Sequence, residues 1–142
     1  VGRDPPDDVV AAGSNPRIEV LGFVPDVRPL VDKASIYVCP IRDGGGTRLK
    51  ILDALAMAKP LVATGLAVEG LGLIEGEHFL RADAPEDFVA QVACLERDPG
   101  LRRRLAVAGR RVVEERFAWG RVADQLEEAY RRASAGGTGG QR

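Results

Sequence analysis

The sequence predicts an α/β fold in which a parallel sheet is flanked by helices. Two short apolar runs, residues 35–40 (SIYVCP) and 60–64 (PLVAT), have the composition of strands that are buried on both faces. Stretches with helical periodicity separate and follow these runs. Buried strands that alternate with helices are typical of parallel βαβ units.

The first expected elements precede these strands. Residues 17–25 (RIEVLGFVP) alternate in character and form a short β-rich run that ends at Gly22. Residues 26–34 (DVRPLVDKA) are expected to form a short helix with Leu30 and Val31 on its inner side.

The remaining elements follow the two apolar strands. A highly apolar helix is expected over residues 47–58, and HFLRA at residues 78–82 predicts a weaker strand. Three later stretches have helical periodicity: residues 84–97, 99–116 and 119–133.

The predicted strands supply the residues that we expect in the core. These are Val20, Leu21, Ile36, Val38, Leu61 and Val62. Trp119 and Tyr130, on the last helix, are expected to pack against the domain. His78, the only histidine, has no serine or cysteine nearby and is interpreted as a surface turn residue without a catalytic role.

Composition excludes several classes of protein. The chain has 142 residues, of which 45% are hydrophobic and 29% charged, which is typical of one soluble globular domain. A net charge of -1 gives no field that would gather nucleic acid. Cys39 and Cys94 lie far apart without metal-ligand spacing, so we expect reduced thiols and no metal site. Without a membrane-length apolar run or a signal peptide, the chain is expected to be cytoplasmic.

Residues 1–133 are expected to form one domain, and residues 134–142 a flexible glycine-rich tail. The first residues, VGRDPP, have the character of the end of a strand that enters a turn. From this abrupt start we expect a longer parent protein.

Three consecutive glycines, Gly44, Gly45 and Gly46, lie between a predicted strand and the helix predicted to begin at Thr47. Parallel sheets bind ligands outside the carboxyl ends of their strands. A helix N-terminus presents free N–H groups and the positive end of its dipole there. Because glycine lacks Cβ, a phosphate could touch this backbone directly, so the segment predicts an anion site.

Thr47, Lys50 and Asp53 share one side of the predicted helix, whereas Arg48 points elsewhere. A cation beside a phosphate, with a carboxylate one turn further on for hydroxyl groups, suits a diphosphate that is attached to sugars. The spacing matches neither a P-loop nor a dinucleotide-binding motif. Spacing alone leaves open that the glycines form only a tight turn and that Lys50 is a solvated helix charge.

The stretches GFVPDVRPLVDKASIYVCPIRDGGGTRLKILDALAMAKPLVATGLAVEGL and ERFAWGRVADQLEEAY resemble the C-terminal domain of the group 1 retaining glycosyltransferases, also called family 4. The match runs from residue 1 to about residue 132 and is most specific in its central part. The resemblance implies a Rossmann-like domain, the C-terminal half of the two-domain GT-B architecture. It also implies an acceptor-binding N-terminal domain outside this chain, without which the chain is expected not to turn over.

The resemblance implies roles for individual residues. Gly45, Gly46 and Thr47, beside Gly44, match the positions that hold the donor diphosphate, and Asp53 matches the acid that holds the ribose. Gly45 and Asp53 both stand where the family usually has glutamate. No separate cofactor is implied, because the nucleotide-diphosphate sugar is the donor substrate.

A second loop and one cation complete the candidate site. Residues 64–76 match a loop that lines the donor pocket in the family, so Thr64, Gly65 and Glu69 are further candidates for donor contacts. Lys50 is the candidate catalytic residue, because a fixed cation would stabilise charge on the leaving β-phosphate.

Two functions remain open on the sequence. The first is the donor-binding half of a glycosyltransferase. The alternative is a non-catalytic interaction or regulatory module with a decayed site, which Gly45 in place of glutamate would permit. Intact Lys50 and Asp53 favour the first.

Overall fold

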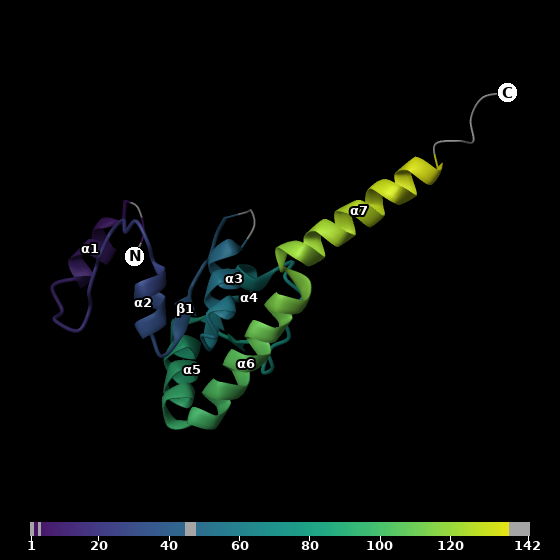
Figure 1. The fold of residues 1–142 in the computed structure, drawn as a ribbon. Coiled ribbons are helices and arrows are strands. Elements are labelled where there is room, and N and C mark those ends of the chain that lie inside the picture. Colours follow the sequence, from purple (N-terminus) through teal and green to yellow (C-terminus); the bar gives the residue numbers. More distant parts are fainter. Residues whose placement is uncertain (1, 3, 45–47, 137–142) are drawn as a thin grey trace. The chain divides into compact units, whose positions relative to one another are not determined.

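The computed structural model describes residues 2, 4–44 and 48–136. The chain divides into two compact units, Val1–Ala34 and Ser35–Arg142. Figure 1 shows the path of the chain through their helices and strands.

The first unit contains the short helices α1 (Asp7–Ala12) and α2 (Arg28–Lys33). Its chain is closed on itself by a hydrogen bond of 2.8 Å from the N–H of Gly2 to the carbonyl oxygen of Gly22. Helix α2 confirms the helix expected within residues 26–34. The β-rich run expected over residues 17–25 is wrong, because those residues form no strand and find no pairing partner among the described residues of this unit.

The second unit is built on a parallel sheet of three strands in the order β1 (Tyr37–Cys39), β2 (Leu61–Ala63) and β3 (Leu80–Arg81). All three strands were expected, and the predicted parallel α/β class is confirmed. Cys39 pairs with Ala63, and Ala63 pairs with Arg81. The carboxyl ends of the strands are therefore in register along one edge.

Five helices are described in the second unit: α3 (Leu49–Ala56), α4 (Gly65–Val68), α5 (Pro85–Arg97), α6 (Pro99–Arg116) and α7 (Trp119–Gly136). Four of them were expected, and the four-residue α4 was not. Local sequence explains the start of α6, because Pro99 occupies its first position and the Asp98 carboxylate accepts a hydrogen bond of 2.8 Å from the Leu101 N–H.

The core lies on both faces of the sheet, because the side chains of β2 alternate between them. Leu61 and Ala63 join the cluster on the face where α3 and α6 pack, whereas Val62 joins the cluster formed with α5 and the start of α6. All three side chains are fully buried, as expected for a central parallel strand.

Not every expected core residue is buried. Val38 is 44% exposed, because β1 is the edge strand and α5 packs over β2 and β3 instead. Val20 and Leu21 are half-buried and lie in the first unit. Ile36 is also half-buried and packs against the Val62 cluster.

His78 lies in a turn as expected, but the expectation that it lies at the surface is wrong, since it is only 4% exposed. Its Nδ1 accepts a hydrogen bond of 2.9 Å from the Ile74 N–H, which closes the turn before β3. Gly109 of α6 lies beside this turn, since a Cβ there would be in ordinary contact, at 3.4 Å, with the His78 carbonyl oxygen.

The expected packing of Trp119 and Tyr130 against the domain is also wrong. Helix α7 forms as predicted, but Trp119 is 88% and Tyr130 66% exposed. Every described side chain of α7 is exposed. Ion pairs between residues four positions apart, such as Arg131 with Glu127, lie along its surface.

Candidate functional site

Three loops meet at the carboxyl edge of the sheet, because the last residues of the strands are in register. Residues 40–44 follow β1, Thr64 and Gly65 follow β2, and residues 82–84 follow β3. A hydrogen bond of 2.5 Å from the Thr64 hydroxyl to the Ile41 carbonyl oxygen joins the first two loops. A hydrogen bond of 2.8 Å from the Gly65 N–H to Asp83 Oδ1 joins the second and third.

Gly44 is the first residue of the glycine segment and has a φ of +113°, a conformation that favours glycine. Its N–H donates to Asp43 Oδ1 at 2.7 Å. Gly45, Gly46 and Thr47, which were expected to contact the donor phosphates, lie outside the described residues.

Helix α3 begins beside this segment. Its N-cap residue is Arg48, and within the described part of the chain no side chain caps the helix. The Arg48 guanidinium instead donates from Nη2 to the Gly44 carbonyl oxygen at 2.9 Å. Arg48 was expected to point elsewhere, so the structure adds a residue that helical spacing alone misses.

Lys50 and Asp53 are both exposed on α3, whereas Ile51, Ala54 and Leu55 on the same helix are buried in the core. The predicted site residues therefore lie on the solvent side of the helix. Their direction is set by the apolar side chains, which fix the rotation of α3 against the sheet and α6.

The electrostatics of β1 show how near these charges lie to the strand. Burial raises the pKa of the Cys39 thiol, and the positive charges of Lys50 and Arg48 act in the opposite direction. Burial also raises the pKa of the Tyr37 hydroxyl, and the charge of Asp53 adds to that effect. Two cations and one carboxylate thus act on the strand that leads into the glycine segment.

The second loop is already engaged within the chain. Thr64 is 4% exposed, and its Oγ1 accepts a hydrogen bond of 3.1 Å from the Ala67 N–H in addition to the bond that it donates to Ile41. The Gly65 N–H is taken by Asp83. Glu69, the third candidate in this loop, is exposed at the C-cap of α4.

Asp83 is the residue of this edge that sequence reasoning missed. Besides accepting from Gly65, its carboxylate accepts from Arg81 Nε at 2.5 Å, and both interactions hold its pKa below the usual range. The one available signal was the acidic DAPED stretch at residues 83–87, which begins where a strand ends.

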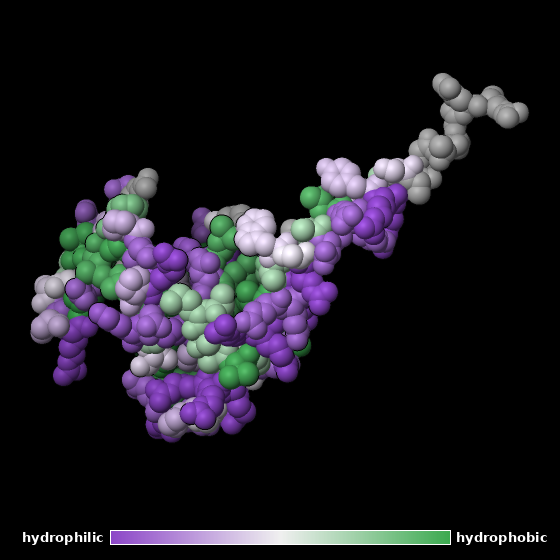
Figure 2. All heavy atoms as spheres, viewed as in Figure 1, coloured by the Kyte–Doolittle hydropathy of each residue, from purple (hydrophilic) through white to green (hydrophobic). Residues whose placement is uncertain are grey.

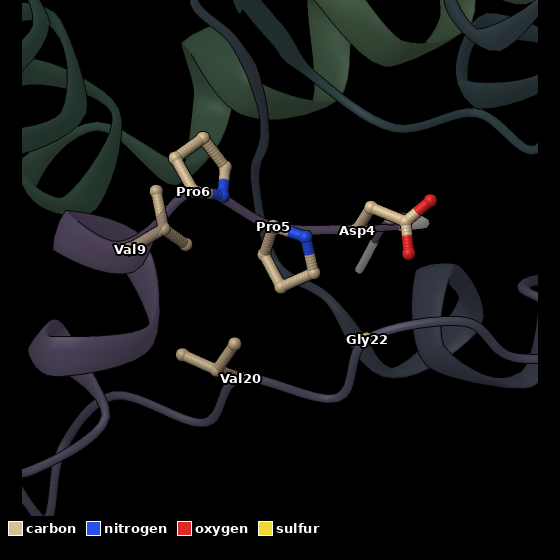
Figure 3. Close-up of a pocket in the computed structure, with 7 residues that line it drawn as sticks. Asp4, Pro5, Pro6, Val9, Val20 and Gly22 are labelled. Carbon is tan, nitrogen blue, oxygen red and sulfur yellow. The ribbon is translucent and has the colours of Figure 1, made fainter.

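The first unit has a pocket of about 250 Å³ with mostly apolar walls. Figure 3 shows Pro5, Val9 and Val20 around it, with the Asp4 carboxylate turned away from them. Its described lining residues include no cation for a diphosphate, and the one charged residue among them, Asp4, would repel an anion. In the described part of the chain, no three His, Cys, Asp or Glu side chains gather as a metal site. Among the same residues, no helix has the length and apolar character to cross a membrane.

Known protein structures share this fold. The C-terminal domain of a group 1 glycosyltransferase, LpcC from Francisella tularensis, matches with a TM-score of 0.66 and 22% identity, over 78% of this chain and 58% of that one. Sucrose-phosphate synthase from Thermosynechococcus elongatus matches with a TM-score of 0.74 and 22% identity, over 90% of this chain and 33% of that one. The Rossmann-like fold of these domains is therefore confirmed for the chain.

Curated relatives match the chain at higher sequence identity than these structures do. A lipopolysaccharide core biosynthesis mannosyltransferase, LpcC from Rhizobium leguminosarum bv. viciae, is 31% identical over 125 residues, which are 87% of this chain and 35% of the relative. An alpha-maltose-1-phosphate synthase from Mycolicibacterium smegmatis is 30% identical over 118 residues, 77% of this chain and 30% of the relative. The chain thus spans about a third of the length of these relatives.

The family described as "Glycosyl transferases group 1" matches residues 1–98. This match includes the sheet edge, the glycine segment and helix α3. The chain belongs to the group 1 glycosyltransferases.

Proposed function

We propose that this chain is the domain that binds a nucleotide-diphosphate sugar, the donor of a glycosyl transfer reaction. The observation that carries the proposal is the start of α3. An exposed lysine and an exposed carboxylate, Lys50 and Asp53, follow a glycine segment at the carboxyl edge of a parallel sheet. That edge is where open α/β sheets bind ligands.

The diphosphate would lie against the backbone from Gly44 to Thr47 and the first turn of α3. The helix dipole favours an anion there, and no described side chain caps the helix. Lys50 would contact the β-phosphate, whose charge grows as the sugar leaves. Lys50 is therefore our candidate catalytic residue.

Asp53 would hold the ribose. It lies one turn beyond Lys50 on the same helix and is exposed. A carboxylate accepts hydrogen bonds from two neighbouring hydroxyl groups, which a ribose offers. The ribose does not change during transfer, so this contact contributes to donor binding more than to the chemical step.

The acceptor and the remaining catalytic groups are proposed to belong to an N-terminal domain of the GT-B architecture. The chain covers 35% of the length of the Rhizobium mannosyltransferase, which leaves room in such a relative for a second domain. On this proposal, the chain alone binds nucleotide weakly and does not transfer sugar.

A titration of the ¹⁵N-labelled chain with UDP, GDP and ADP tests the proposal. We expect the largest amide shift changes at Gly44, Lys50 and their neighbours with at least one nucleotide, and a smaller effect in Lys50→Ala. No binding by any of the three would contradict the proposal.

Shift changes confined to the outer face of α6 would also contradict it. Figure 2 shows hydrophilic side chains over that face, where Arg103, Arg104 and Arg111 surround the exposed Val107. Non-specific attraction of a diphosphate to these arginines is the competing explanation. The variant Arg103→Ala/Arg104→Ala, which leaves the sheet edge intact, is the matched control.

A further inference from the structure

We propose that Thr64 and Asp83 are positioning residues of the donor site, which hold the start of the glycine segment in place without contacting the donor. The inference rests on the proposed function, since it assigns these two residues a part in donor binding. It departs from the family resemblance, which makes Thr64 a candidate for direct contact.

Thr64 joins the ends of β1 and β2. Its hydroxyl donates to the Ile41 carbonyl oxygen at 2.5 Å and accepts from the Ala67 N–H at 3.1 Å. A hydroxyl has one proton to donate, and here that proton is used within the chain. With 4% of its surface exposed, Thr64 has no free donor for a phosphate oxygen.

Ile41 is the residue through which this bond acts on the site. It lies two residues after Cys39, the last residue of β1, and its carbonyl oxygen accepts from the Thr64 hydroxyl. The Ile41 residue is therefore tied to β1 on one side and to β2 on the other. Two residues further on, Asp43 accepts from the N–H of Gly44, where the glycine segment begins.

Asp83 extends the same connection to β3. Its Oδ1 accepts from the Gly65 N–H at 2.8 Å, and its Oδ2 accepts from Arg81 Nε at 2.5 Å. The Arg81 guanidinium lies close against Gly65. A Cβ added at that glycine would be only 2.9 Å from Arg81 Nη2. The carboxylate thus fixes the turn that carries Thr64.

The bonds form one continuous path across the sheet edge, from Asp83 through Gly65 and Thr64 to Ile41. Backbone bonds alone are weaker at this point, since the Thr64 N–H to Cys39 carbonyl distance is 3.4 Å. Side chains therefore supply the close links that hold the loop after β1 to the loop after β2.

The test uses Thr64→Val, which keeps the shape of the side chain and removes the hydroxyl. Thr64→Ser keeps the hydroxyl, and Asp83→Ala breaks the exposed end of the path. Val62→Ala is the control, because Val62 is fully buried in the same strand and faces the other side of the sheet. It destabilises the unit without touching the edge bonds.

Two quantities are measured on the chain: amide hydrogen exchange at Ile41, Asp43 and Gly44 without ligand, and affinity for the nucleoside diphosphate that binds the wild type best. We expect Thr64→Val to make exchange at these amides about tenfold faster and nucleotide affinity about tenfold weaker, the factor for one lost buried hydrogen bond. Thr64→Ser should restore both, and Asp83→Ala should act in the same direction as Thr64→Val.

Exchange at these three amides that is no faster in Thr64→Val than in Val62→Ala would overturn the inference. If Thr64→Val fails to fold, Asp83→Ala provides the same comparison from the exposed end of the path. A wild-type chain that binds no nucleoside diphosphate would sink the proposed function, and the inference with it. Normal nucleotide binding by Thr64→Val would sink the inference alone.

Discussion

Two of the helices that begin at the carboxyl edge of the sheet, α3 and α4, have different N-termini. At α4 the chain satisfies its own amides, because Thr64 accepts from Ala67 and Asp83 accepts from Gly65. At α3 no described side chain caps the helix, and the nearby Arg48 guanidinium binds a carbonyl oxygen instead. At the same edge, therefore, the N-terminus of α4 is satisfied by a carboxylate, whereas the N-terminus of α3 has positive charge beside it.

On the proposed function, this difference would separate the residues that bind the donor from those that support the site. An amide that already has a carboxylate partner gains little from a phosphate, whereas the first turn of α3 retains its dipole and two cations. Lys50 and Arg48 both act electrostatically on Cys39 below this turn. The comparison therefore favours α3 as the donor helix and α4 as part of its support.

Lys50→Ala in the complete enzyme tests the proposed phosphate contact at the N-terminus of α3 and should have the largest effect. Loss of one fixed donor to the leaving phosphate is expected to cost about 2–4 kcal/mol of transition-state stabilisation. Because this charge develops during the reaction, kcat should fall more than the donor KM rises. Steady-state kinetics at varied donor concentration measure both.

An equal rise in KM for Lys50→Ala and Arg48→Ala, with kcat unchanged, would reduce Lys50 to an anchor for the ground state. Circular dichroism of each variant checks its fold. Lys50 is exposed, so its removal should leave stability nearly unchanged.

Gly109→Ala tests how α3 is held from its buried side. A Cβ at Gly109 would lie 2.6 Å from Leu55 Cδ2, on the face of α3 that packs against α6. The packed core has no space for it, so we expect a loss of about 1–3 kcal/mol in the free energy of unfolding. Urea unfolding followed by circular dichroism measures this loss.

Gly120→Ala is the control for that substitution, because nothing lies within 4 Å of the added Cβ on α7. It should be neutral or slightly stabilising, since alanine favours a helix over glycine. Equal stability of the Gly109 and Gly120 variants would show that α3 moves freely to make space.

Asp53→Ala tests the ribose contact and should act on donor affinity. Uniform binding is lost, so the donor KM should rise by about tenfold, the equivalent of one hydrogen bond to a charged group, while kcat changes less. Asp53→Asn should retain part of the affinity. A fall in kcat that exceeds the rise in KM would place Asp53 nearer the reacting bond than we propose.

The pH dependence of thermal stability tests the Asp83 carboxylate at the N-terminus of α4, and we expect this effect to be the smallest. The Gly65 N–H and then Arg81 hold the pKa of Asp83 below its usual range, so the charged form is favoured in the folded state. Its stabilisation is present at neutral pH and is lost as the pH falls below the usual carboxyl range toward the lowered pKa. Asp83→Asn should therefore lose less thermal stability on acidification than the wild type. Parallel curves would contradict the role given to this carboxylate.

The fold of the second unit was largely predictable, because its signals are periodic and local. The runs that contain β1 and β2 are short and apolar, and α6 begins at a proline after a capping Asp98. In the first unit, the alternation of residues 17–25 misled, since a strand also needs a partner strand. For Val38 the missing information was which helices cover which strands.

The geometry of the candidate site was predictable where one helix carries it and not where strands far apart in sequence meet. Lys50 and Asp53 follow from spacing within α3, and both are exposed as a ligand would require. Asp83 contacts Gly65 across 18 positions of sequence, a proximity that only the parallel register creates. His78 was also misplaced, since its burial in the turn before β3 is a tertiary property that its neighbours in sequence do not reveal.

Trp119 has a practical consequence for all of these measurements. It is the only tryptophan of the chain and is 88% exposed at the start of α7. Its fluorescence in the native chain should resemble that of indole in water, with a red emission maximum and efficient quenching by iodide. Unfolding of the sheet would barely change that emission. A blue shift would instead report that another surface has covered this end of α7, which makes Trp119 a built-in probe of assembly.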